Sequence, residues 1–326
     1  MILEKLFTVI DETATWLQEE LKCSYLEAVA ETGENIFHED VLQEEVSELL
    51  KKRLKKAYQS ISLHDWKNEH IRKALQLAML KGMKEYVQPH HQMTPDAVSV
   101  FIGYLVDEFT KTHFSLSLLD PAIGTGNLMT AVLNQLTNKK ARSYGADADD
   151  LLLKLAYVNA NLQQHEIQLF HQDSLKPLFI EPVDVVVCDL PIGYYPDDEN
   201  AKSFRLHAKS GHSYAHYLFI EQSIRYTKEG GYLFFLIPNM LFTSDESKEL
   251  HALIKEETFI QGLLQLPRSM FKNEAAAKSI FILQKKGTYA KAPKQALLAQ
   301  LPSFSNKQAM QAMVLKLEQW LKENRS

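Results

Sequence analysis

The stretch from Asp120 to Met129, Asp-Pro-Ala-Ile-Gly-Thr-Gly-Asn-Leu-Met, constrains this chain more than any other part of its sequence. The apolar run Leu116–Leu119 precedes it and is typical of a short buried strand, and apolar residues recur at helical spacing from Leu128 onward. Gly124 and Gly126 permit positive φ angles and a close approach of a ligand to the main chain. A strand, a tight glycine turn and a helix in this order predict the nucleotide-binding crevice of an open α/β sheet.

The residues around the glycines distinguish between two kinds of ligand. The dinucleotide fingerprint Gly-x-Gly-x-x-Gly/Ala needs a small third residue for close helix packing, and Met129 occupies that position. Asp120 would also repel a diphosphate. A carboxylate instead favours a ligand with a cationic amino-acid end, such as S-adenosyl-L-methionine, which carries an ammonium and a sulfonium and no phosphate. A nicotinamide oxidoreductase is therefore disfavoured, and an ordinary structural glycine turn is the simplest alternative.

The turn Asp-Pro-Ala-x-Gly-Thr-Gly resembles motif I of the class I S-adenosylmethionine-dependent methyltransferases that act on adenine N6 in DNA, including the modification subunits of type I restriction systems. Two other segments resemble the same family. Gln92–Pro95 is similar to the Gln-Phe-x-Thr-Pro segment that covers the methionine end of the donor, and Gly230–Pro238 is similar to Gly-Gly-x-x-x-x-(Ile/Val)-Pro. The resemblance runs from Gln88 to Lys286 and implies S-adenosyl-L-methionine as the methyl donor.

Acidic residues beyond the glycine turn are further candidates for donor binding. Asp147 ends the predicted second strand, about 20 residues after the glycines, where a carboxylate can accept hydrogen bonds from ribose hydroxyls. Asp149 is the alternative, but the family pattern Gly-x-Asp/Glu-x-Asp points to Asp147. The resemblance implies that Asp173, after the third predicted strand, bonds the donor's adenine amine. The predicted donor site comprises Thr94, Asp120, Ala122, Gly124, Thr125, Gly126, Asn127, Leu128, Asp147, Ala148, Asp173, Ser174 and Asp189.

The β-branched run Val183–Cys188 is typical of a central strand covered on both faces. It ends in Asp-Leu-Pro-Ile, which resembles motif IV of the family, (Asn/Asp/Ser)-Pro-Pro-(Tyr/Phe). In that motif an acceptor side chain and the next backbone carbonyl bind both hydrogens of a planar amine and aim its nitrogen at the sulfonium methyl. The resemblance therefore makes Asp189, Leu190 and Pro191 the catalytic candidates.

Two positions depart from motif IV. Leu190 replaces a proline, and Ile192 replaces the aromatic ring that stacks on the substrate, a contact worth about 1–3 kcal/mol. Tyr194 or Tyr195 could supply a substitute ring, so Ile192, Tyr194 and Tyr195 are the substrate-binding candidates. A structural turn on a donor-binding protein that no longer methylates is the alternative interpretation of this segment.

A chain of 326 residues is longer than one core usually supports, which favours two domains. Residues 1–86 carry apolar side chains only at helical spacing and predict a small all-helical N-terminal domain. Two prolines in the polar stretch Gln88–Pro95 mark its end. For residues 87–326 the resemblance implies a Rossmann-like methyltransferase domain with a seven-stranded mixed sheet, closed by an antiparallel pair at Ile260–Leu266 and Ser279–Gln284.

Composition and charge limit the compartments and the binding partners to be expected. The only cysteines, Cys23 and Cys188, exclude a disulfide framework and a cysteine-rich zinc site, and no metal is predicted. No apolar run reaches the roughly 18 residues of a membrane span, and the start lacks a signal-peptide pattern, so we expect a cytoplasmic protein. A net charge of -5 without a clear basic stripe predicts weak binding of duplex DNA by the isolated chain.

The sequence therefore predicts an S-adenosylmethionine-dependent N-methyltransferase similar to adenine-N6 DNA methyltransferases. Because no target-recognition domain is recognisable, a separate specificity subunit is the expected source of sequence recognition. Two alternatives stay open: a methyltransferase that acts on RNA or protein glutamine, and a donor-binding regulatory module. The sequence does not indicate which oligomeric state the protein adopts.

Overall fold

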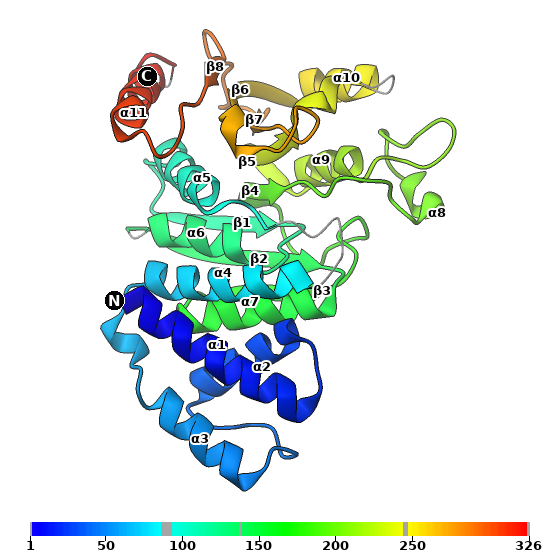
Figure 1. Ribbon diagram of the computed structural model, residues 1–326. Coiled ribbons are helices and arrows are strands. Elements are labelled where there is room, and N and C mark those ends of the chain that lie inside the picture. Colours follow the sequence, from blue (N-terminus) through cyan, green and yellow to red (C-terminus); the bar gives the residue numbers. More distant parts are fainter. Residues whose placement is uncertain (1, 86–92, 137, 244–246, 325–326) are drawn as a thin grey trace. The chain divides into compact units, whose positions relative to one another are not determined.

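The computed structural model describes residues 2–85, 93–136, 138–243 and 247–324 (Figure 1). The chain begins with helices and continues with alternating strands and helices, and the strands form a mixed sheet. Most of the predicted boundary stretch, residues 88–92, lies outside the described residues, as does the predicted division between residues 86 and 87.

The bounds of the helices and strands are as follows. The helices are α1 (Ile2–Leu21), α2 (Tyr25–His38), α3 (Glu48–Tyr58), α4 (Asn68–Glu85), α5 (Asp96–Phe109), α6 (Asn127–Gln135), α7 (Asp150–Leu162), α8 (Asp198–Ala201), α9 (Ala215–Arg225), α10 (Ser247–Glu257) and α11 (Lys307–Asn324). The strands are β1 (Ser115–Asp120), β2 (Lys140–Asp147), β3 (Ile167–His171), β4 (Val183–Asp189), β5 (Thr227–Pro238), β6 (Thr258–Gln265), β7 (Lys278–Lys285) and β8 (Leu297–Gln300).

The strands form one sheet in the order β3-β2-β1-β4-β5-β7-β6-β8. The pairs β2–β3, β1–β4 and β4–β5 are parallel, whereas β7 runs antiparallel to β5 and to β6. This confirms the predicted antiparallel pairing of β6 and β7. The β-branched run within β4 is fully buried, as expected of a central strand, with Val183 and Val185–Cys188 all 0% exposed.

The prediction of seven strands is wrong, because the described part of the chain contains an eighth. β8 lies at the edge of the sheet and pairs parallel to β6, with Leu297 opposite Gly262. It spans only four residues, Leu-Leu-Ala-Gln, and Leu298 is 70% exposed. A segment this short shows no clear alternation of apolar and polar residues, so pattern analysis could not find it.

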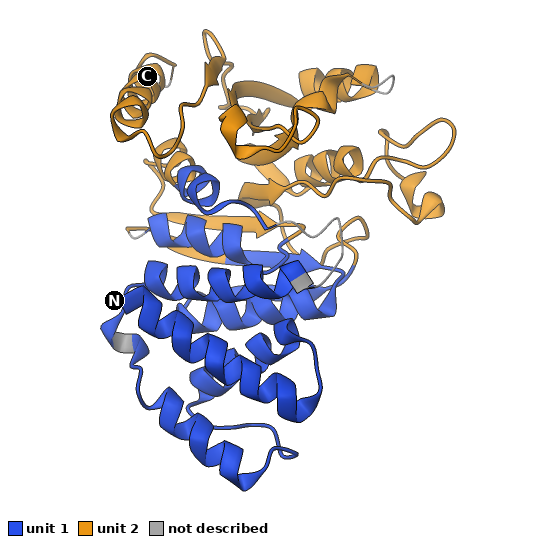
Figure 2. Cartoon of the chain, in the orientation of Figure 1, with its two compact units in different colours: residues 1–103, 123–137, 143–172 blue, residues 104–122, 138–142, 173–326 orange. Residues whose placement is uncertain are grey.

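The chain forms two compact units (Figure 2). Unit 1 comprises residues 1–103, 123–137 and 143–172, and unit 2 comprises residues 104–122, 138–142 and 173–326. Unit 1 therefore joins the N-terminal helices to the glycine turn, α6 and α7. No helix in the described part of the chain is long and apolar enough to cross a membrane. The division of the chain into residues 1–86 and 87–326 stays a prediction.

In unit 1 the N-terminal helices and α7 share one hydrophobic core. The apolar face of α7, formed by Leu152, Leu155, Val158 and Leu162, belongs to the same cluster as the buried residues of α1, α2 and α4. The helices approach closely: a Cβ added to Gly33 on α2 would lie 2.0 Å from Cγ1 of Val158. Packing of this kind fixes α7, and α7 in turn packs against the glycine turn.

Candidate functional site

The two glycines of the turn have different surroundings. Both have positive φ, 53° at Gly124 and 73° at Gly126, and Gly126 is the N-cap of α6. A Cβ added to Gly124 would meet nothing within 4 Å, whereas one added to Gly126 would lie 3.2 Å from Cα and Cβ of Ala156 on α7. Gly124 thus leaves the main chain open to a ligand, and Gly126 allows the turn to pack on α7.

The carboxylate of Asp147, at the end of β2, is bonded to the glycine turn. Its Oδ2 accepts a hydrogen bond from the Gly124 amide at 2.8 Å, and its Oδ1 accepts from the Asp149 amide at 2.9 Å. Asp149 instead caps α7, because its Oδ1 accepts from the Leu152 amide at 2.9 Å. The carbonyl of Ala148, between them, lies 3.2 Å from Nε2 of His171. Only Asp147 of the two ribose candidates is tied to the turn.

The residues that follow Gly124 point their side chains inward. Thr125, Asn127 and Leu128 are 5%, 3% and 4% exposed. The Thr125 carbonyl accepts a hydrogen bond from Nδ2 of Asn159 at 3.1 Å. What these three residues can offer a ligand is therefore chiefly main chain, as expected where a glycine turn opens a helix.

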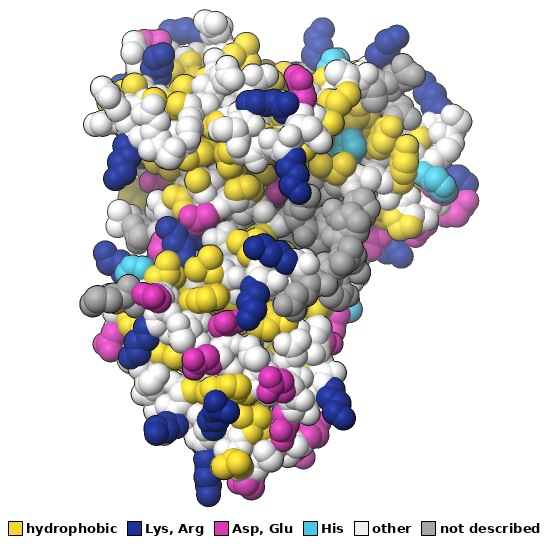
Figure 3. Space-filling view, in the orientation of Figure 1, with side chains coloured by type: hydrophobic (Ala, Val, Ile, Leu, Met, Phe, Trp, Pro, Cys, Tyr) yellow, Lys and Arg dark blue, Asp and Glu magenta, His cyan; other side chains and the backbone are white. Residues whose placement is uncertain are grey.

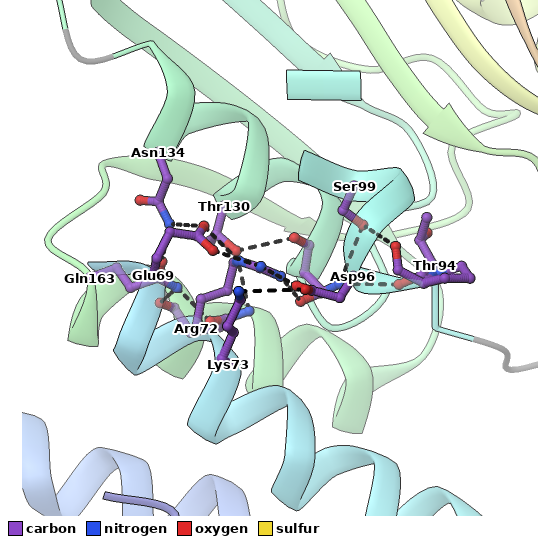
Figure 4. A network of polar contacts seen from close by, with 12 residues as sticks. Glu69, Arg72, Lys73, Thr94, Asp96, Ser99, Thr130, Asn134 and Gln163 are labelled. Carbon is purple, nitrogen blue, oxygen red and sulfur yellow. Dashed lines mark hydrogen bonds and ion pairs between the residues drawn. The ribbon is translucent and has the colours of Figure 1, made fainter. Parts of the chain in front are cut away.

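A buried arginine of α4 lies beside the start of α6 (Figure 4). Nη1 of Arg72 donates to Oδ1 of Asn127 at 2.8 Å, and Nε and Nη2 donate to the two carboxylate oxygens of Glu69 at 2.9 and 2.8 Å. Nη2 also contacts Asp96, at the start of α5. Nδ2 of Asn127 donates to the carbonyl of Thr94 at 3.3 Å. Sequence analysis missed Arg72, since helical spacing does not reveal that a charged residue turns inward.

In unit 2, Asp120 ends β1 and is 1% exposed. Its Oδ1 accepts from the Ala122 amide at 3.1 Å. Burial, together with the carboxylates of Asp120 and Asp189, raises the pKa of the Cys188 thiol well above its ordinary value. Cys188 is therefore a protonated, buried thiol and not a nucleophile.

Asp173, which follows β3, is held by a tyrosine. Its Oδ1 accepts from the Leu175 amide at 2.9 Å, and its Oδ2 accepts from the Tyr195 hydroxyl. Burial and this hydrogen bond raise the pKa of Tyr195, so the phenol stays protonated and donates. The next residue, Ser174, is buried, and its hydroxyl has no hydrogen-bond partner among the described residues.

The motif IV segment continues from the carboxyl end of β4. Oδ1 of Asp189 lies 2.7 Å from Nζ of Lys278, the first residue of β7. Leu190 is buried, and its amide donates to the Leu236 carbonyl at 3.2 Å. Pro191 is half-buried. The segment is thus anchored to β5, its neighbour in the sheet, and to β7, the next strand beyond it, with an acidic side chain at its start.

The two candidate tyrosines occupy opposite environments. Tyr195 is buried, and its hydroxyl oxygen also accepts from Nδ2 of Asn200 at 2.9 Å. Tyr194 is 62% exposed and stacks on Tyr214, with ring centroids 5.0 Å apart and planes inclined by 18°. Ile192 is 49% exposed. An exposed ring beside motif IV is therefore available from Tyr194, whereas Tyr195 is engaged with Asp173.

Among the described residues, no group of three or more His, Cys, Asp or Glu side chains could hold a metal ion. Unit 1 carries the open glycine turn with Asp147 bonded to it, and unit 2 carries Asp120, Asp173, Asp189 and the exposed ring of Tyr194. Acidic side chains and an exposed ring suit an organic, cationic ligand and a planar acceptor better than an anionic ligand.

A parallel sheet that continues into an antiparallel β7, with a glycine turn after β1 and an acidic residue at the end of β2, defines the class I methyltransferase fold. Two family models match the chain: the YtxK N-terminal helical domain over residues 4–83 and N-6 DNA Methylase over residues 84–320. The chain belongs to the N-6 DNA Methylase family. This confirms the resemblance to S-adenosylmethionine-dependent methyltransferases that motif I predicts.

The chain is also similar to individual proteins. The chain is 51% identical over 324 residues to the uncharacterized protein YtxK of Bacillus subtilis (strain 168), a match that covers 98% of this chain and 97% of that protein. It is similar to the crystal structure of a Listeria monocytogenes protein proposed to be a class I S-adenosylmethionine-dependent methyltransferase, with a TM-score of 0.91, 48% identity and 98% of both chains covered. It shares its fold with a type I restriction-modification methyltransferase subunit from Streptococcus thermophilus, with a TM-score of 0.63, 16% identity, and 96% of this chain and 74% of that chain covered.

Proposed function

We propose that this chain transfers the methyl group of S-adenosyl-L-methionine to the exocyclic amine of adenine in DNA. The observation that carries the proposal is the placement of Asp189 at the carboxyl end of β4, in a chain of the N-6 DNA Methylase family. Open α/β sheets bind their ligands at the carboxyl ends of their strands.

The residues of the glycine turn fit the donor. Gly124 has open space where a Cβ would lie, so a ligand can approach its main chain. Asp147 has both oxygens oriented by backbone amides of the turn and of Asp149, which places a carboxylate, a group that accepts from ribose hydroxyls, at the end of β2. We assign the adenine end of the donor to Asp173 and Ser174, and its cationic end to the negative potential of Asp120. When bound, the donor supplies a methyl group made electrophilic by the adjacent sulfonium.

Asp189 and the Leu190 carbonyl are the groups that orient the acceptor. Each would accept one hydrogen of the planar amine, which draws the nitrogen lone pair out of conjugation and directs it at the methyl carbon. On transfer the amine nitrogen would form the new N–C bond as the C–S bond breaks, the bonding pair would leave with sulfur, and the methylated amine would lose one proton to water. Rate then comes chiefly from orientation and from carboxylate stabilisation of the positive charge that develops on nitrogen.

Tyr194 is the proposed substitute for the aromatic ring that motif IV lacks. Its exposed, stacked ring can receive the face of a base, while Ile192 adds apolar contact. We propose DNA as a weakly bound partner of the isolated chain and a separate specificity subunit as the source of sequence recognition. The same geometry would accept an RNA base or a glutamine amide, since both present a planar amine.

One observation favours a second candidate, a donor-binding regulatory module. The ammonium of Lys278 already contacts the carboxylate that an acceptor amine would need. If this pair persists, the donor turn would bind its ligand while motif IV stays idle. The departures at Leu190 and Ile192 agree with this alternative.

Transfer of tritiated methyl groups to duplex DNA, RNA and cell protein, with calorimetry of donor binding alongside, separates these candidates. We expect one donor site per chain and label in DNA adenine. Label in RNA or protein would show that the chain is a methyltransferase but that its acceptor is not DNA. Donor binding without transfer to any polymer would favour the regulatory module, and absence of donor binding would refute the donor site itself.

A further inference from the structure

We infer that Arg72, on the N-terminal helix α4, is a positioning residue of the methyl-donor site. The inference rests on the proposed function of the glycine turn and extends it, because it assigns a role in donor binding to the N-terminal helices. Arg72 itself is 0% exposed, so it acts through the residues that it holds.

The guanidinium fixes the orientation of the Asn127 side chain. Arg72 carries only donors, so the amide of Asn127 must turn its oxygen toward Nη1, at 2.8 Å. The amide nitrogen then faces the Thr94 carbonyl, at 3.3 Å, and the Ser99 hydroxyl. Arg72 also contacts Asp96 directly (Figure 4). One side chain thereby ties the Thr94–Asp96 segment to the first residue of α6.

A second branch of the same network returns to the turn. Oε1 of Glu69, the bidentate partner of Arg72, accepts from Nδ2 of Asn134 at 2.9 Å. The same Nδ2 donates to Oε1 of Gln163 at 2.9 Å, and Nε2 of Gln163 donates to Oδ1 of Asn159 at 2.6 Å. Nδ2 of Asn159 then donates to the Thr125 carbonyl, at 3.1 Å.

The two branches therefore end on either side of Gly126. One fixes the carbonyl of Thr125 and the other fixes the side chain of Asn127. Gly126 has φ 73° and cannot be held there by a side chain of its own. Hydrogen bonds to both neighbours supply that restraint, and with it the orientation of the open main chain at Gly124.

A buried network of this kind is better suited to orienting its partner side chains than to stabilising the fold. A buried charge pair adds little net stability, because desolvation of the ions offsets their attraction. The side chains of Glu69 and Asp96 are 28% and 40% exposed, whereas the guanidinium is shielded completely. A planar fork with fixed donor directions holds several partners in one geometry, which an ammonium cannot do.

The test is donor affinity, measured by calorimetry with S-adenosyl-L-methionine, in the full chain and its variants. Arg72→Lys should weaken binding at least tenfold, because one ammonium cannot contact Glu69, Asp96 and Asn127 together. The matched control is Lys154→Met, which removes two ion pairs of α7, to Glu31 and Glu34 of α2 at 2.6 and 3.2 Å, without touching the network. The control should lower the melting temperature and leave donor affinity within about twofold.

A double variant separates positioning from general stability. Because one of the two branches runs through Asn127, Arg72→Lys combined with Asn127→Ala should weaken donor binding by clearly less than the product of the two single effects. If the two single effects on donor affinity multiply in the double variant, the inference about Arg72 is wrong. It is also wrong if the parent binds the donor and Arg72→Lys binds it equally well. Neither result would affect the proposed function. A parent that binds no donor would refute the proposed function instead.

Two further variants serve if Arg72→Lys does not fold. Asp96→Asn keeps the shape of the network but removes the charge that pairs with Arg72, and Asn127→Asp keeps an acceptor for Arg72 but cannot donate to the Thr94 carbonyl. Each should weaken donor binding about fivefold or more while Arg72 keeps its bidentate pair with Glu69. Unchanged affinity in both would overturn the inference.

Discussion

The ammonium of Lys278 lies 2.7 Å from Oδ1 of Asp189, and the two side chains are almost equally shielded, 15% and 16% exposed. The first residue of an antiparallel strand thus contacts the acidic residue that ends the central parallel strand. Asp189 is consequently held in one orientation before any acceptor arrives. This pair links the stability of the sheet to the chemistry proposed at its edge.

Replacing Asp189 with alanine should separate transfer from donor binding. Transfer should fall by about two orders of magnitude, because one preorganised contact is lost. Donor affinity should stay within about twofold, and asparagine should retain part of the activity because it keeps an acceptor oxygen. Filter-binding assays of tritiated methyl transfer measure the rate, and calorimetry measures the affinity. Transfer at the parent rate by the alanine variant would exclude motif IV as the catalytic site.

The same variant should reveal the energetic role of Lys278. Loss of Asp189 removes a charged partner from a shielded ammonium, so urea unfolding should show a loss of about 1–3 kcal/mol. The double variant Asp189→Ala with Lys278→Met should regain much of this, since removal of both partners leaves no unpaired charge. If the double variant is less stable than the single one, the pair is not the cause.

Alanine at the two turn glycines should have different consequences. Gly124→Ala should cost about 1–2 kcal/mol of backbone strain and abolish donor binding, because its Cβ fills open space. Gly126→Ala should lose more stability, since its Cβ also crowds Ala156. Thermal unfolding and calorimetry distinguish the two effects.

Gly230→Ala is the matched control for strain. Gly230 has φ 76° and nothing within 4 Å of an added Cβ, as at Gly124. It should lose similar stability and bind the donor normally. A folded Gly124→Ala variant that binds the donor as well as this control would show that the site has been misplaced.

The neighbouring tyrosines should affect different ligands. Tyr194→Ala should weaken acceptor binding by about 1–3 kcal/mol and leave donor affinity unchanged. Tyr195→Phe should weaken donor binding, because it removes the hydroxyl that holds Asp173. Donor calorimetry and the KM for the acceptor measure the two effects. Interchanged results would mean that the buried ring, and not the exposed one, covers the substrate.

Stability should decline on acidification from about pH 6.5 to pH 4. Burial lowers the pKa of His165 and of His216 to about 4, although Glu69 opposes the shift at His165. The unfolded chain takes up these protons near pH 6.5 and the folded chain only near pH 4. The free energy of unfolding therefore falls as the pH is lowered between these two values. Urea unfolding at pH 7, 5.5 and 4.5 measures the decline.

His216→Leu should flatten that decline. Nδ1 of His216 has no hydrogen-bond partner among the described residues, so the substitution should cost little at pH 7. An unchanged slope in the variant would show that other groups govern the acid sensitivity.

The isolated chain should bind duplex DNA weakly. Its net charge is -5, and on the face drawn in Figure 3 basic side chains are interspersed with acidic ones. Fluorescence anisotropy should show binding at low salt that is lost steeply as salt rises. Tight, sequence-specific binding at physiological salt would contradict this and would remove the need for a separate specificity subunit.

Local patterns predicted the parts of the fold in which neighbouring residues determine the structure. The apolar run before Asp120, the glycine turn and the β-branched run of β4 each carry their signal within a few residues. The strands β6 and β7 were found in the same way, whereas their antiparallel pairing was implied by the family resemblance. β8 was not found, because four partly exposed edge residues give no period.

The side-chain contacts were beyond such patterns. Arg72 precedes Asn127 by 55 residues and Asp189 precedes Lys278 by 89, and neither spacing has a sequence signature. Family resemblance named Asp189 and Asn127 but not the cations that orient them. Folding alone brings these partners together, so only the structure reveals them.

The apolar face of α7 makes the methyltransferase domain dependent on the N-terminal helices. Leu155 and Val158 are 0% and 1% exposed because the N-terminal helices cover them. A gene that lost its first 83 codons would encode a methyltransferase domain with this hydrophobic surface facing water, and aggregation would follow. Any relative without such helices must carry polar residues on α7 or cover it in another way. The two family segments of this chain are therefore expected to have been inherited, and to change, together.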